Sequence, residues 1–304
     1  MSKSKFEQSI FESKMQIRHS AIVFYSQIVN PRRNYNKICT EKTYTGNITF
    51  GSAKRIRKAV DLLLQLSPPR KIYNPIIKKD VNHSLSFITL TIPAKERHLT
   101  PYEGNQLLLE KWLRKMRDKH NLKTYVWKAE YQKNGQLHYH ITTPSFINWN
   151  IIKTEWNNIM YANGMLVEWH KVNPNKSPNS TDVHAVYKCK DIQAYLSKYL
   201  QKDVHGRSAA EQKKYKESLT EDQKEQLANI KIGKIWDCSL WLKKVPHFST
   251  TEPSNLCNWI KETEIIRTDY CGLFFCKNIK SKVPAPVYEE YQNYLKSIKP
   301  EMMF

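Results

Sequence analysis

Two histidines two residues apart, His138 and His140, are the first side chains whose types and spacing could do chemistry. They lie in "GQLHYHITT", where apolar and polar residues alternate as in a half-buried β-strand. Residues two apart on a strand point to one face, so both imidazoles would project side by side. A carboxylate would complete a ligand set for a divalent cation, and Glu130 lies upstream. The pattern indicates either a metal site or a solvated strand face that carries two histidines.

The side on which Glu130 lies depends on the turn that follows it. The Asn-Gly pair at 134–135 supplies the positive φ angles of a tight hairpin. If these two residues form the whole loop, Glu130 pairs with Tyr139 and points away from the histidines. A longer loop or a bulge brings Glu130 onto the histidine face. If Glu130 faces away, His170 and His184 are the alternative ligands, although an ordinary hydrogen-bonded strand histidine explains each of them more readily.

A second group of reactive side chains occurs in "AYLSKYLQK", and it consists of Tyr195, Lys198, Tyr199 and Lys202. The i, i+3, i+4, i+7 spacing places all four on one face of a helix. A tyrosine with a pKa of ~10 is a weak nucleophile at neutral pH, but a nearby ammonium group or metal ion can activate it. The stripe is therefore suited to attack on a phosphate, with the lysines balancing charge. A surface helix whose Tyr and Lys side chains extend into solvent is the alternative.

These groups need a sheet for the histidines and a helix for the tyrosines, and the surrounding sequence predicts both. Alternating β-branched and aromatic residues predict strands at 84–93, 124–131, 136–143, 165–172 and 182–189. Apolar residues at helical spacing predict helices at 52–66, 101–120, 150–164 and 191–202. A meander of strands interrupted by helices predicts an α+β fold, with a central, mainly antiparallel sheet flanked by helices.

Composition along the chain predicts four regions. Residues 1–80 form a basic N-terminal extension, and residues 81–203 form the core that carries the motifs. Residues 204–230 are highly charged and predict a helical insertion. Residues 231–304 are expected to pack on the core or to complete it.

The overall composition favours a polyanionic partner. Forty-nine Lys and Arg residues against 28 Asp and Glu residues give a formal net charge of +21. Aromatic residues make up 12% of the chain and could stack on bases. The six cysteines show no C-x-x-C spacing, which argues against a zinc ribbon or a disulfide framework. We see no signal peptide and no membrane span, so we expect a soluble, intracellular protein.

Three motifs in order, "FITLTIP", "GQLHYHI" and "AYLSKYLQK", resemble those of the rolling-circle replication initiators of the HUH endonuclease superfamily. The doubled Tyr-x-x-Lys pattern is most similar to the initiation proteins of microvirus-type single-stranded DNA phages and of related plasmids. "GKIWDCS" resembles a downstream segment of the same group. The resemblance is strong over the central third of the chain and weak in the C-terminal part. It implies an HUH endonuclease-like fold and a cytoplasmic location in a bacterial host.

The resemblance also implies a role for each motif. The two histidines and Glu130 would bind Mg²⁺ or Mn²⁺. One tyrosine of the helical stripe would attack a DNA phosphate and form a 5′-phosphotyrosyl bond with a free 3′-OH, and the two lysines would assist. Single-stranded or hairpin origin DNA would be the substrate. A host helicase and polymerase would be partners, because the chain has no P-loop motif. A non-catalytic nucleic-acid-binding protein and an HUH-type single-strand transposase are the alternatives.

Overall fold

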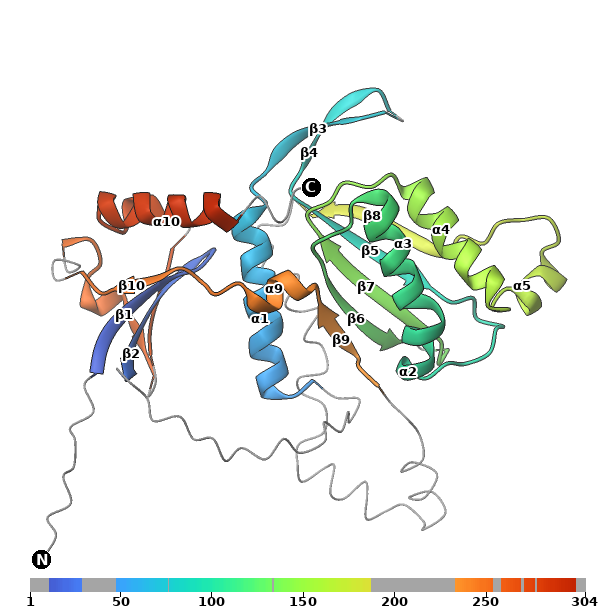
Figure 1. Ribbon diagram of the computed structural model, residues 1–304, viewed down its shortest axis with the longest axis horizontal. Coiled ribbons are helices and arrows are strands. Elements are labelled where there is room, and N and C mark those ends of the chain that lie inside the picture. The colour runs from blue at the N-terminus through green and yellow to red at the C-terminus, as the bar shows by residue number, and fades with distance from the viewer. Residues whose placement is uncertain are drawn as a thin grey trace, which may run out of the picture. The chain divides into compact units, whose positions relative to one another are not determined.

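The computed structural model describes residues 11–28, 48–186 and 233–298, apart from 76, 133, 254–257, 269–270 and 277. The chain divides into two compact units. The smaller unit consists of residues 1–42 and 245–300, and the larger one of residues 43–244 and 301–304. Each unit contains a five-stranded sheet (Figure 1). The sequence analysis treated the two ends of the chain as separate regions, whereas the smaller unit joins them.

The larger unit is built on a sheet with the strand order β8-β5-β7-β6-β9, in which every neighbouring pair is antiparallel. Its strands are β5 (Leu85–Thr91), β6 (Val126–Tyr131), β7 (Leu137–Thr143), β8 (Thr181–Val186) and β9 (Trp236–Cys238). Alternating β-branched and aromatic residues favour these strands, because one face packs on a core. The predicted α+β class with mainly antiparallel sheets flanked by helices is confirmed.

Helices pack on one face of this sheet. They are α2 (Pro101–Gly104), the π-helical η1 (Asn105–Leu109), α3 (Glu110–His120) and α4 (Trp149–Ala162). The first three follow one another without a break and match the helix predicted at 101–120. Their apolar side chains form a core with alternate residues of the sheet, including Leu90, Trp112, Tyr139, Ile141 and Trp156. No helix in the described parts of the chain combines the length and the apolarity that a membrane crossing needs.

A helix and a ribbon precede the sheet in the sequence. The helix α1 (Phe50–Leu66) matches the prediction at 52–66 and contacts β6 and the short helix α9 (Leu240–Lys244). It begins at Thr49, whose Oγ1 accepts a hydrogen bond from the Ser52 N–H at 3.1 Å. The strands β3 (Arg70–Asn74) and β4 (Lys79–His83) then form a two-stranded antiparallel ribbon. Figure 1 shows this ribbon projecting from the five-stranded sheet.

Residues 167–172 form the helix α5 (Val167–Val172), so the strand predicted at 165–172 is wrong. The His170 N–H donates to the Leu166 carbonyl at 3.0 Å, which is a helical hydrogen bond. Met165 and Leu166 are both buried, whereas Val167 is exposed, and this distribution does not alternate as a strand requires. An apolar segment of this length does not distinguish a strand from a short helix.

The smaller unit has a second antiparallel sheet, with the order β10-β1-β2-β12-β11. Its strands are β1 (Phe11–Ile17), β2 (Ala21–Ile28), β10 (Ser249–Thr251), β11 (Ile266–Arg267) and β12 (Gly272–Phe275). Its other elements are η3 (Glu262–Glu264), η4 (Ile279–Ser281) and α10 (Ala285–Ile298). Lys14 pairs with Thr251, 237 residues away, so the two ends of the chain share this sheet.

Candidate metal centre

Glu130, His138 and His140 lie on one face of the larger unit's sheet. Strands β6 and β7 pair Glu130 directly with His138. Opposed residues of antiparallel strands project to the same side, and His140 is two residues further along β7. The register that pairs Glu130 with Tyr139 is therefore wrong, and the longer-loop alternative is the one that the structure adopts.

The turn between β6 and β7 explains this register. The Gln132 N–H donates to the Gln136 carbonyl at 2.8 Å, and the Gly135 N–H donates to the Gln132 carbonyl at 2.9 Å. Three residues rather than two therefore separate the last paired residues. Gly135 has a φ of +80°, a conformation that glycine adopts without a steric penalty. A three-residue loop that ends on a left-handed glycine is a common hairpin connection, and it shifts the pairing by one residue.

One carboxylate oxygen joins the three side chains. Oε1 of Glu130 accepts a hydrogen bond from Nε2 of His138 at 2.9 Å and from Nε2 of His140 at 3.1 Å. The potential ligand atoms of the three residues all lie within 4.8 Å of one another. His140 is buried, whereas His138 and Glu130 are half-buried. The group is therefore packed on the His140 side and open to solvent on the other.

The donor set fits a divalent cation. Two imidazole nitrogens suit first-row transition metals, and a carboxylate oxygen suits Mg²⁺ and Mn²⁺. Within the described ranges, this is the only group of three His, Cys, Asp or Glu side chains that converges in this way. The alternative ligands lie outside it. The His170 ring packs against Tyr161 and Trp169, and the His184 ring packs against Phe87.

The surroundings keep Glu130 ionised and His140 neutral. Burial raises the pKa of Glu130, but hydrogen bonds from the two histidines outweigh it and hold this pKa well below its ordinary value. Lys128, whose side chain is fully buried, donates to Oε2 of Glu130 at 3.4 Å. Burial lowers the pKa of His140. The cluster thus presents the protonation states that metal ligands require.

Strand β5 orients His140. It pairs Thr89 with His140, and Oγ1 of Thr89 lies 3.1 Å from Nδ1 of His140. The Phe87 ring stacks on the His140 ring with 5.2 Å between centroids and 27° between planes. A partner on Nδ1 leaves Nε2 directed at Glu130, which is how outer contacts commonly position a histidine ligand. The "FITLTIP" motif therefore contributes contacts to the cluster as well as a strand of the sheet.

Tyr139, between the two histidines, anchors β7 on the opposite face. Its side chain is fully buried and packs edge-to-face against Trp127 and Trp156. Burial raises the pKa of the Tyr139 hydroxyl well above its ordinary value. This tyrosine therefore has a structural role in holding the histidine strand on the helical core.

The "GKIWDCS" segment reaches the site as β9. It pairs Trp236 with Lys128, the residue that contacts Glu130, and the Arg55 guanidinium lies 5.8 Å from the centre of the Trp236 ring. Gly233 precedes this strand with a φ of +72°, and a Cβ there would lie 2.7 Å from the Cα of Tyr102. Only glycine fits this approach of two backbones.

Sequence reasoning missed the contributions of Lys128, Thr89 and Phe87. For Thr89 and Phe87 a signal existed, because residues 87, 89 and 91 of one strand share a face. The predicted nucleophiles and their lysines, Tyr195, Lys198, Tyr199 and Lys202, lie outside the described residues. The same is true of the helix predicted at 191–202 and of the insertion predicted at 204–230.

A comparison with protein families links this region to replication. The family model described as replication-associated protein ORF2/gene II protein matches residues 85–204. This range starts at the first residue of β5 and includes the Glu130–His138–His140 cluster and the sequence positions of both tyrosines. The match supports a role in replication initiation, and the cluster is compatible with endonuclease chemistry. Comparisons with curated proteins and with solved structures give no significant match.

Proposed function

We propose that this protein is an HUH-type replication-initiation endonuclease that nicks and rejoins single-stranded or hairpin origin DNA in rolling-circle replication. The observation that carries the proposal is the convergence of Glu130, His138 and His140 within the segment that matches a replication-associated family. The net charge of +21 supports a DNA substrate, because neutralised phosphates release counterions. A host helicase and polymerase would supply strand separation and synthesis.

The residues of the chain divide the work. Glu130, His138 and His140 would hold Mg²⁺ or Mn²⁺, which when bound polarises a phosphate oxygen. Lys128 and Thr89 keep Glu130 and His140 in place through the contacts described above. The buried side of the cluster excludes water, so the DNA would approach from the open side at His138.

The chemical step is a phosphodiester transfer to tyrosine. The hydroxyl oxygen of Tyr195 or Tyr199 attacks the phosphorus and gives up its proton. The bond between phosphorus and the 3′ oxygen breaks, and that oxygen takes up a proton to become the free 3′-OH. Lys198 and Lys202 would stabilise the negative charge that develops on the phosphate. Attack of a 3′-OH on the phosphotyrosyl bond reverses these steps and rejoins the strand.

The test is formation of a covalent protein–DNA adduct. The protein is incubated with Mn²⁺ and a labelled single-stranded library that contains a randomised segment, and denaturing electrophoresis detects adducts. We expect an adduct for the wild type, none for Tyr195→Phe/Tyr199→Phe, and a reduced yield for one of the two single variants. Tyr161→Phe is the matched control, since Tyr161 is 69% exposed and lies outside the cluster.

Two outcomes would contradict the proposal. One is the absence of any adduct across the library under conditions in which the protein binds the same DNA. This outcome favours the non-catalytic nucleic-acid-binding protein. The other is an adduct of undiminished yield in the double tyrosine variant, which would place the nucleophile elsewhere in the chain.

A further inference from the structure

Two pockets of the larger unit share the side chain of Phe146. Both lie where the β3–β4 ribbon meets the loop that follows β7. One has a volume of about 410 Å³, and we call it the neutral pocket; its lining includes Asn74, Asn82, His83, Ser86, Phe146 and Trp149. The other has a volume of about 250 Å³, and we call it the Arg70 pocket; its lining includes Arg70, Asn121, Pro144, Ser145 and Phe146. Neither pocket contains a residue of the metal cluster.

The neutral pocket has the chemistry of a site for an uncharged ring. Among the described residues that line it, none is Lys, Arg, Asp or Glu. Burial and the neighbouring Arg70 charge lower the pKa of His83 to about 4, so this ring is neutral at neutral pH. Trp149 is 48% exposed and offers a free ring surface for stacking. Aromatic rings together with amide and hydroxyl groups match the faces and edges of a nucleobase.

A single phenylalanine separates this pocket from the metal cluster. The Phe87 ring contacts His140 on one side and His184 on the other, with 5.2 Å between centroids in both cases. His184 lines the neutral pocket. A base in this pocket would therefore belong to a nucleotide close to the phosphate at the cluster.

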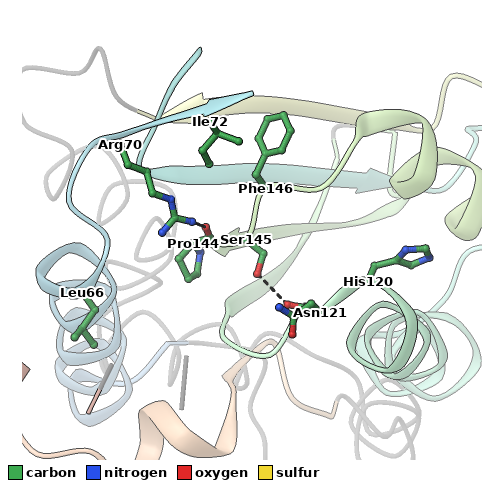
Figure 2. A pocket seen from close by; sticks show the side chains of 8 residues that line it. All are labelled: Leu66, Arg70, Ile72, His120, Asn121, Pro144, Ser145 and Phe146. Carbon is green, nitrogen blue, oxygen red and sulfur yellow. Dashed lines mark hydrogen bonds between the residues drawn. The ribbon is translucent and has the colours of Figure 1, made fainter. Parts of the chain in front are cut away.

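The Arg70 pocket offers a phosphate-binding group on the other side of Phe146. Figure 2 shows the Arg70 guanidinium turned toward Pro144, whose carbonyl accepts from Nη2 of Arg70 at 3.1 Å. This hydrogen bond fixes the guanidinium at the pocket wall. A guanidinium has five N–H donors, so the others can bind phosphate oxygens.

The ribbon extends this positive charge. Arg70 pairs with His83 across the ribbon, which places a phosphate-binding group opposite a residue of the neutral pocket. Lys71 pairs with Asn82 and Lys79 pairs with Asn74, and both lysines are exposed. The neutral pocket is thus bordered by cations but contains none, which is the distribution that a base flanked by phosphates requires.

We infer that the two pockets hold one unstacked nucleotide of single-stranded DNA, with its base stacked on Trp149 in the neutral pocket and a phosphate on Arg70. The inference rests on the proposed function only for the identity of the strand. It adds a binding site that selects single-stranded over duplex DNA, since a paired base cannot enter the pocket.

Binding in the absence of metal tests this inference. We would measure fluorescence anisotropy in EDTA with a labelled oligothymidylate of about 20 nucleotides and with an abasic oligomer of the same length. Trp149→Ala should weaken binding of oligothymidylate roughly tenfold and leave binding of the abasic oligomer unchanged, because base stacking is lost. Trp149→Phe should retain most of the affinity. Trp259→Ala, which removes an exposed tryptophan of the smaller unit, is the matched control.

A second variant tests the phosphate contact. Arg70→Gln should weaken binding of both oligomers and lower the slope of log K against log salt concentration by about one. An unchanged slope would overturn the phosphate assignment. Unchanged oligothymidylate binding by Trp149→Ala, or an equal loss on both oligomers, would overturn the base pocket.

These results are independent of the nicking chemistry. If Trp149→Ala behaves as expected but no covalent adduct forms in the tyrosine experiment, the pocket stands and the proposed function fails. If the adduct forms but Trp149→Ala binds normally, the reverse holds.

Discussion

The buried pair of Lys128 and Glu130 allows a quantitative test of the site's architecture. Nζ of Lys128 lies 3.4 Å from Oε2 of Glu130, and the Lys128 side chain is fully buried. At an effective dielectric constant of about 20, two unit charges at this distance attract by roughly 5 kcal/mol before desolvation is subtracted. Removing one partner of a buried pair typically destabilises a protein by about 3–5 kcal/mol. Because Glu130 is half-buried, we expect the lower end of this range.

A double-mutant cycle isolates this interaction. We expect Glu130→Gln to lower the free energy of unfolding by about 3 kcal/mol, because Lys128 loses a carboxylate that balances its buried charge. Lys128→Met should lower it by about 2 kcal/mol, since Met fills the same space. The double variant should lose about 2 kcal/mol or less, which gives a coupling energy of about 3 kcal/mol. The assay is urea unfolding followed by tryptophan fluorescence in EDTA, so that bound metal does not contribute.

Additive effects would refute this reasoning. If the double variant loses the sum of the two single losses, the pair contributes no coupling, and Lys128 does not hold Glu130 at the cluster. Lys119→Met is the control, because Lys119 is exposed and should change the free energy of unfolding by less than about 0.5 kcal/mol.

Three further predictions follow from single residues. Thr89→Val should weaken Mn²⁺ binding by about 10–100-fold, since it removes the partner of His140 Nδ1; isothermal titration calorimetry measures this, and unchanged affinity would exclude the positioning role. Gly135→Ala should lower the free energy of unfolding by about 1 kcal/mol because φ is +80°; urea unfolding checks it, and a gain in stability would contradict the left-handed turn. The pKa of His83 is about 4 against an ordinary 6.5, so between these values the unfolded state binds a proton that the folded state does not. Stability is therefore lost as pH falls, by about 2 kcal/mol between pH 7 and 5; His83→Asn should lack this loss, and an equal pH dependence in both proteins would disprove it.

The strands of the site were predictable because their own residues define them. Alternating β-branched and aromatic side chains gave β5, β6 and β7, and the shared face of His138 and His140 follows from the two-residue period of any strand. Helical spacing gave α1, α3 and α4 for the same reason.

The side on which Glu130 lies was not predictable, because it depends on one residue in a turn. "KNG" is compatible with a two-residue and a three-residue loop, and the choice inverts the face of every residue on the partner strand. The two-residue loop was the simpler prediction. The structure adopts the three-residue loop, which places Glu130 opposite His138.

Long-range pairing also lay beyond the sequence. The strand at Trp236 adds to β6 next to Lys128, and Lys14 pairs with Thr251, although neither segment carries a signal that names its partner. The importance of Lys128 could not be seen for the same reason. A lysine in a strand is usually exposed, and only the assembled sheet shows that this one is fully buried against Glu130.

Titration with Mn²⁺, monitored by electron paramagnetic resonance, tests the central claim most directly. The account predicts that the wild-type protein binds one Mn²⁺ at the cluster and that His138→Ala and His140→Ala each abolish this site. His184→Ala, which changes a histidine outside the cluster, should leave it intact. Wild-type protein that binds no Mn²⁺, or binding that survives the loss of His138 and of His140, would contradict the account.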